Sequence, residues 1–184
     1  MKNFIAIATL VAMTSGLTFL ATNQSTVAEE SAVVEFSRGA IDFGIVCSDV
    51  KKSVAFYKDV VGMKEIEGFD VPASLAADAG LVDNHDLHVH VLVTQEASSS
   101  TRLKLMQIKD APGKKVDHAF IHSSLGMSYS TIWGSDIDAS LARAAAGNVK
   151  PLAKGPVALP NGMFLAVIRD PDGNFVELVG PRRK

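Results

Sequence analysis

The sequence predicts an α+β fold made of two repeats, each consisting of a strand, a helix and three further strands. Three observations support this fold class. A strand, a helix cap and a helix occur twice, 87 residues apart; each half ends on an apolar strand that contains one charged residue; and paired apolar segments are separated by turn residues. We expect the repeats to form a curved mixed sheet around a concave pocket, with the helices outside.

The first repeat begins with an apolar strand at Ile41–Cys47, which is followed by a helix. Asp49 is a good helix N-cap, and Gly62 suits the helix C-terminus. Apolar residues recur between them at the spacing of one helical face, namely Val50, Val54, Tyr57 and Val61. The single cysteine, Cys47, rules out an intrachain disulfide and is expected to be a small core residue.

The second repeat begins near Tyr129 and has the same order of signals. Ser135-Asp136-Ile137 matches Ser48-Asp49-Val50, and Ser140-Leu141-Ala142 matches Ser53-Val54-Ala55. Asp136 is the expected cap and Gly147 the expected end of this helix.

The later strands of each half are predicted as hairpins. In the first half, Met63–Phe69 is one strand, and Leu87–Thr94 pairs with Arg102–Ile108. In the second, Phe164–Arg169 pairs with Asn174–Val179 across the turn sequence DPDG. Lys104 lies between two leucines of one hairpin, and Glu177 lies between two apolar residues of the other.

Length and charge limit the functions to consider. The chain has 184 residues, 47% of them hydrophobic, and a net charge of -2, which predicts one domain and no nucleic-acid partner. Lys2, an apolar run to Ala21, and Thr26 with Ala28 resemble a signal peptide covering 1–28, with cleavage after Ala28. We therefore expect export to the periplasm or the exterior, with no membrane association after cleavage; an uncleaved anchor is the alternative. Residues 29–38 are a linker and 39–184 a single domain, with repeats at about 40–109 and 127–182.

Four segments carry a family resemblance: IDFGIVCSDVKKSVAFYKDVVGM, RLKLMQIKDAPG, SDIDASLARAAAG and RDPDGNFVELVGP. Together they resemble the vicinal oxygen chelate (VOC) superfamily, which includes glyoxalase I, bleomycin resistance proteins and extradiol dioxygenases. The resemblance covers roughly residues 40–182. It implies the fold described above and a pocket for a small molecule, and it allows a homodimer whose sites combine residues of both chains. It does not select a reaction, because this superfamily contains lyases, epimerases, oxygenases and plain binding proteins.

The resemblance also implies where a divalent metal would bind. The four ligand positions of metal-dependent relatives fall on Asp42, Lys104, Tyr129 and Glu177, and only Glu177 is a retained ligand type. A protonated lysine repels a cation and cannot coordinate it. We therefore predict no firm cofactor, with a divalent metal as the alternative, and we predict that Lys104 is a counter-ion for Asp42 and Glu177, with Tyr129 hydrogen-bonded to them.

Two functions follow from this interpretation. In the first, the protein binds a small organic molecule in a pocket lined by Asp42, Lys104, Tyr129, Trp133 and Glu177. In the second, it is a glyoxalase-like lyase, isomerase or epimerase that uses Glu177 as the base and Lys104 as the catalytic cation, with or without a metal.

Two histidine pairs have spacings that can bind metals. His88 and His90 share one face of a predicted strand, and His118 and His122 are four residues apart in a predicted loop. Neither pair has a third ligand at a matching spacing, so both are interpreted as surface or pocket-lining residues.

Overall fold

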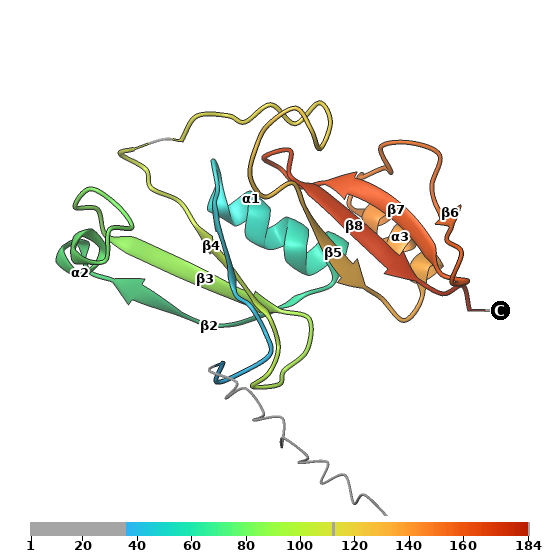
Figure 1. Ribbon diagram of the computed structural model, residues 1–184, viewed down its shortest axis with the longest axis horizontal. Helices are drawn as coiled ribbons and strands as arrows, with labels where there is room; N and C mark the ends of the chain where they lie inside the picture. The colour runs from blue at the N-terminus through green and yellow to red at the C-terminus, as the bar shows by residue number, and fades with distance from the viewer. Residues whose placement is uncertain (1–35, 112, 184) are drawn as a thin grey trace, which may run out of the picture. The chain divides into compact units, whose positions relative to one another are not determined.

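The structure is a computed structural model that describes residues 36–111 and 113–183, and it confirms the α+β class with two repeats (Figure 1). The elements of the first repeat are β1 (Phe43–Val46), α1 (Val50–Ala55), the π-helical turn η1 (Phe56–Val61), β2 (Lys64–Val71), α2 (Ala73–Asp78), β3 (Leu87–Val93) and β4 (Arg102–Met106). Those of the second are β5 (Tyr129–Trp133), α3 (Ile137–Ala146), β6 (Val157–Ala158), β7 (Phe164–Arg169) and β8 (Phe175–Gly180). The predicted signal peptide lies outside the described residues.

Each repeat forms its own four-stranded mixed sheet, so the expected curved sheet is divided into two. The strand orders are β1-β4-β3-β2 and β5-β8-β7-β6, and the two orders are equivalent. In each sheet the first strand runs parallel to the last, and the remaining neighbours are antiparallel. The predicted hairpins β3–β4 and β7–β8 are both confirmed.

Both predicted helix caps are confirmed. Asp49 accepts a hydrogen bond from the backbone N–H of Lys52 at 3.1 Å, and Asp136 accepts from the N–H of Asp138 at 3.0 Å. Gly62 has φ of 90°, a left-handed conformation that favours glycine, and it ends the first helical segment as predicted. The second half of that segment is π-helical rather than α-helical, which the spacing of its apolar residues did not indicate.

The two sheets and their helices share one hydrophobic core. Its buried members include Leu103 and Leu105 from β4, Val176 and Leu178 from β8, Tyr57 and Val60 from η1, and Ile137 and Ala144 from α3. One face of each helix packs in this core, with Val60 and Ala144 buried, while the opposite face is exposed, for example at Lys58 and Ala142. Because side chains alternate along a strand, the residues between the core leucines and valines face away from this core.

A smaller cluster covers the other face of the first sheet. The helix α2, which the sequence analysis missed, buries Ala76 against Leu87, Val89 and Val91 of β3. Its six residues are too few for a clear helical period. Among the described residues, no helix combines the length and the apolar character needed to cross a membrane.

Candidate functional site

Lys104 and Glu177 occupy equivalent positions in the two sheets. Lys104 is paired with Gly44 of β1, and Glu177 is paired with Thr131 of β5. The repeat spacing of 87 residues relates Gly44 to Thr131, so the register agrees with the placement made from the repeat. Both charged residues face away from the shared core, since their strand neighbours Leu103, Leu105, Val176 and Leu178 are buried in it.

Lys104 belongs to a compact ionic cluster on the first sheet. Its Nζ lies 3.1 Å from Asp42 Oδ2, while Arg38 Nη2 lies 2.6 Å from Asp42 Oδ1. The backbone N–H of Arg102 donates to the same carboxylate at 3.2 Å. Partial burial raises the pKa of Asp42, but the hydrogen bonds from Arg38, Lys104 and the Arg102 amide outweigh it and lower that pKa to about 2. Asp42 is therefore a carboxylate that already has its counter-ions.

Glu177 has a different partner. It accepts a hydrogen bond of 2.7 Å from the Thr131 hydroxyl, its neighbour on β5. Tyr129 lies two residues before Thr131 on the same face, with 51% of its surface exposed. Within residues 36–111 and 113–183 of one chain, no ion pair joins Lys104 to Glu177. The two pairs Asp42–Lys104 and Tyr129–Glu177 thus lie on separate sheets.

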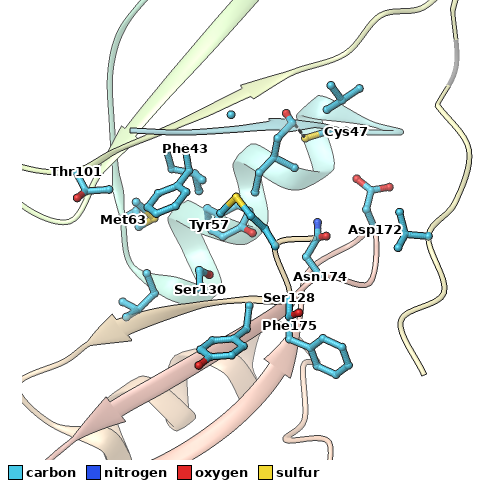
Figure 2. Close-up of a pocket in the computed structure, with 18 of the residues that line it drawn as sticks. Phe43, Cys47, Tyr57, Met63, Thr101, Ser128, Ser130, Asp172, Asn174 and Phe175 are labelled. Carbon is cyan, nitrogen blue, oxygen red and sulfur yellow. Dashed lines mark hydrogen bonds between the residues drawn. The ribbon is translucent and has the colours of Figure 1, made fainter. Parts of the chain in front are cut away.

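A cavity of about 940 Å³ lies between the first strands of the two sheets, β1 and β5. Figure 2 shows Phe43, Met63 and Tyr57 grouped at one end of it, with Asp172 and Asn174 toward the other. Further apolar lining comes from Ile45, Leu103 and Ile132. The volume falls within the range of pockets for small organic ligands, and its lining mixes apolar side chains with many polar ones.

Polar side chains also line the cavity, from Thr101 near the Phe43 end to Asn174 toward the other (Figure 2). Ser128, Ser130 and Asn174 line it, and Lys109, Lys114 and Lys115 come from the segment that follows β4. Asp172 also lines it, but its carboxylate accepts hydrogen bonds from the backbone N–H of Ser48, at 3.1 and 3.3 Å. Among the described residues no ion pair involves these three lysines, so they are the lining charges available to a ligand group.

Comparison with known proteins decides the family. The model of the Glyoxalase/Bleomycin resistance protein/Dioxygenase superfamily matches residues 40–178. The chain belongs to this superfamily.

Solved structures agree with this assignment. A glyoxalase family protein from Bacillus cereus matches with a TM-score of 0.67 at 19% identity, covering 83% of this chain and 99% of that one. A glyoxalase I variant from Zea mays matches with a TM-score of 0.58 at 15% identity, covering 78% and 46%. TnmS3, an antibiotic-binding protein from Streptomyces sp. CB03234, matches with a TM-score of 0.50 at 25% identity, covering 77% and 94%. No curated protein sequence matches significantly.

The superfamily's metal positions do not fit a divalent ion in this chain. The ammonium group of Lys104 occupies one of the four positions and is bonded to Asp42, which occupies another. An ion there would have to displace a cation from its carboxylate, against strong electrostatic repulsion. Across the described ranges, no three His, Cys, Asp or Glu side chains are grouped closely enough to hold a metal. We therefore derive no reaction step through a metal at Asp42, Lys104, Tyr129 and Glu177.

The predicted site residues are divided between two places. Tyr129 and Trp133 line the cavity, and Trp133 is 64% exposed at the end of β5. Asp42, Lys104 and Glu177 do not line it, because they face away from the shared core while the cavity opens beside it. Within one chain the cavity is lined by β1 and β5, and a pocket around Asp42, Lys104 and Glu177 stays a prediction.

The sequence analysis missed the residues that fix this cavity. The Tyr57 hydroxyl donates a buried hydrogen bond of 3.1 Å to Asp170 Oδ2, across the two repeats. Burial raises the pKa of Tyr57, and the negative charge of Asp170 raises it further. Asp170 and Asp172 are the two acids of the DPDG turn. The sequence analysis used this motif only to predict the turn, although two acids so close together could have indicated a further role.

The remaining candidates from the sequence analysis are Cys47 and the two histidine pairs. Cys47 is buried, and burial raises the pKa of its thiol, which is consistent with the expected core role. His118 stacks on Phe175 and His122 stacks on Phe120, in a segment without helix, so these histidines do not form a helical ligand pair. His88 and His90 lie on one face of β3, as predicted, with ring centroids 4.8 Å apart.

Proposed function

We propose that the protein binds a small organic molecule in the cavity between β1 and β5. The observation that carries this proposal is a volume of about 940 Å³ whose lining combines apolar and aromatic side chains with many polar ones. The walls include the ring of Phe43 and the exposed rings of Tyr129 and Trp133, which offer stacking and van der Waals contact to an aromatic ligand. The three lysines of the lining favour a ligand that also has a polar or acidic group, so the expected ligand is amphipathic.

The comparison with TnmS3 supports this proposal. That protein is described as an antibiotic-binding protein, and it shares 25% identity with this chain at a TM-score of 0.50. A bulky aromatic antibiotic would match the size and the lining of the cavity. Ligand binding without chemistry also needs none of the catalytic metal ligands that this chain lacks at the superfamily positions.

Ligand binding can be measured through the intrinsic fluorescence of this protein. Trp133 is the only tryptophan and it lines the cavity, so its fluorescence should change when a ligand binds. We would titrate the purified protein with 8-anilinonaphthalene-1-sulfonate, an aromatic anion, and with a panel of aromatic antibiotics. Saturable quenching or a spectral shift of Trp133, matched by calorimetry, is the expected result.

A matched pair of variants locates the binding. Ser130→Phe places a ring in the cavity and should weaken binding at least tenfold, whereas Ser98→Phe, in an exposed loop position outside the lining, should leave it unchanged. Both variants are first checked by circular dichroism and melting temperature. Equal affinities for the two folded variants would show that the ligand binds elsewhere.

We also propose that two copies associate, so that Asp42 and Lys104 of one chain face Tyr129 and Glu177 of the other. The support is electrostatic. The cluster around Lys104 has two cationic side chains, Lys104 and Arg38, for one acid, Asp42. Among the described residues, the Thr131 hydroxyl is the only hydrogen-bond partner of the Glu177 carboxylate. The expected partner group of Glu177 is therefore a cation of the second copy.

Cross-linking tests this association. The double variant Lys104→Cys/Glu177→Cys, treated with a short bismaleimide, should give covalent dimers by mass spectrometry. A second double variant, Lys104→Cys/Lys150→Cys, controls for random collision, because Lys150 lies in an exposed loop after α3. Sedimentation of the unmodified protein as a monomer at all concentrations would rule the association out.

Two remaining proposals concern the metal and export. We propose that the Lys104 position keeps a resident metal out, so that Lys104→Glu improves divalent metal binding relative to the unchanged protein. We propose that residues 1–28 are removed during export, which predicts a secreted or periplasmic product whose first residue is Glu29 by N-terminal sequencing.

A further inference from the structure

We propose that His88 and His90 form a surface site for one transition-metal ion of the zinc, copper and nickel class. Both residues lie on β3, two positions apart, so they project from the same face of the first sheet. Neither lines the cavity, and neither occupies a metal position of the superfamily. The inference is therefore independent of the proposed ligand binding.

The ring geometry suits a shared ion. The two imidazole centroids lie 4.8 Å apart, with an angle of 88° between the ring planes. Two imidazoles bound to one tetrahedral zinc ion, with Zn–N bonds of about 2.0–2.1 Å, place their centroids roughly 5 Å apart. The His88 side chain is 65% accessible, so an ion can reach it from solvent.

Both rings are held by carboxylates through the nitrogen that a metal would not use. Nδ1 of His88 contacts Asp70 Oδ1, and Nδ1 of His90 lies 2.9 Å from Glu65 Oε1. Within residues 36–111 and 113–183, neither Nε2 atom has a hydrogen-bond partner. A carboxylate on one ring nitrogen orients a metal-binding histidine and raises its basicity, which is the arrangement seen here twice.

The surrounding charge favours a cation. The strand β2 supplies Glu65 and Asp70, and the exposed Glu67 lies between them, where the register with β3 shifts. Lys58 Nζ lies 3.1 Å from Glu65 Oε2 and, among the described residues, is the only lysine or arginine that pairs with these acids.

The type of ligand atom determines which metal ions the site can bind. The described residues offer two imidazole nitrogens and no grouped third ligand, so water completes the coordination. Imidazole suits zinc, copper and nickel, whereas calcium and magnesium require oxygen ligands. The site should therefore bind one zinc or nickel ion per chain and should ignore calcium and magnesium.

The test uses zinc on the purified, tag-free protein. Calorimetry should show one saturable Zn²⁺ equivalent, and NMR should show zinc-dependent shifts for the rings of His88 and His90. His88→Ala should weaken Zn²⁺ binding at least tenfold, and Asp70→Asn should weaken it about tenfold by loosening the His88 ring. His122→Ala removes another exposed histidine and serves as the matched control.

Each outcome decides the proposal. Loss of Zn²⁺ binding in His88→Ala with retention in His122→Ala, both with unchanged melting temperature, supports the site. Equal weakening in the two variants, zinc-induced shifts at other histidines, or no saturable binding overturns it. Should His88→Ala be unstable, His88→Gln keeps the size and polarity of the side chain and tests the loss of the ligand.

Discussion

Removal of the Tyr57 hydroxyl should lower the free energy of unfolding, because this hydroxyl forms a hydrogen bond between the two repeats. The hydroxyl is buried and donates to Asp170 Oδ2 at 3.1 Å, and the tyrosine is only 1% exposed. Asp170 keeps three other donors in Tyr57→Phe, namely the N–H groups of Asp172 and Asn174 and the Asn174 side-chain amide. The carboxylate is thus partly satisfied, and the expected loss lies at the lower end of the range for hydrogen bonds to charged groups.

That range sets the magnitude. Hydrogen bonds to charged groups contribute about 1.5–3 kcal/mol, so we expect Tyr57→Phe to lower the free energy of unfolding by about 1.5–2 kcal/mol. With a urea m-value of about 2 kcal/mol/M, the midpoint should fall by roughly 0.8–1 M while m stays constant. The assay is equilibrium urea unfolding followed by Trp133 fluorescence and circular dichroism.

Tyr129→Phe is the control for this measurement. Its ring is half exposed and it forms no hydrogen bond within the part of the chain that the structure describes, so its stability should change by less than about 0.5 kcal/mol. If Tyr57→Phe shifted the midpoint no more than Tyr129→Phe, the buried Tyr57–Asp170 contact would not hold the repeats together. The account of how the cavity walls are fixed would then be wrong.

Two further predictions concern the same framework. The pKa of Asp42 is about 2, below the value of about 3.9 expected in the unfolded chain, so its stabilising effect is complete above pH 4 and is lost as pH falls toward 2. Acid unfolding should therefore be shallower between pH 4 and pH 2 in Asp42→Asn than in the unchanged protein. A Cβ atom at Gly180 would lie 2.6 Å from the Gly134 carbonyl oxygen, so Gly180→Ala should cost about 1–3 kcal/mol by overpacking, measured as a lower urea midpoint.

Local signals in the sequence were sufficient for most of the elements. The caps Asp49 and Asp136, the stop at Gly62 and the hairpin across DPDG are short-range features whose chemistry is set by adjacent residues. The repeat spacing also placed Lys104 and Glu177 at equivalent register positions, because a duplicated strand order reproduces the same neighbours. These features need no knowledge of how the two halves pack.

The tertiary arrangement could not be predicted in the same way. Apolar periodicity shows which face of a strand is buried, but it does not show what that face is buried against. Here Leu105 and Leu178 face one shared core, and the expected concave pocket is divided between two sheets. The Tyr57–Asp170 contact joins residues 113 positions apart, so no local pattern could reveal it.

Glu177→Gln distinguishes a role within one chain from a role between two. Within one chain, Thr131 donates to Glu177 Oε2 at 2.7 Å, and an amide oxygen at that position can accept the same hydrogen bond. Monomer stability should therefore change by less than about 0.5 kcal/mol, because no charged partner is lost. If Lys104 of a second copy faces Glu177, the same variant should weaken association several-fold in sedimentation and should do so less at high salt, where the unchanged protein also loses this attraction. A large loss of stability in dilute, monomeric Glu177→Gln would contradict both parts of the argument, since it would mean that the charge of Glu177 is already compensated inside its own chain.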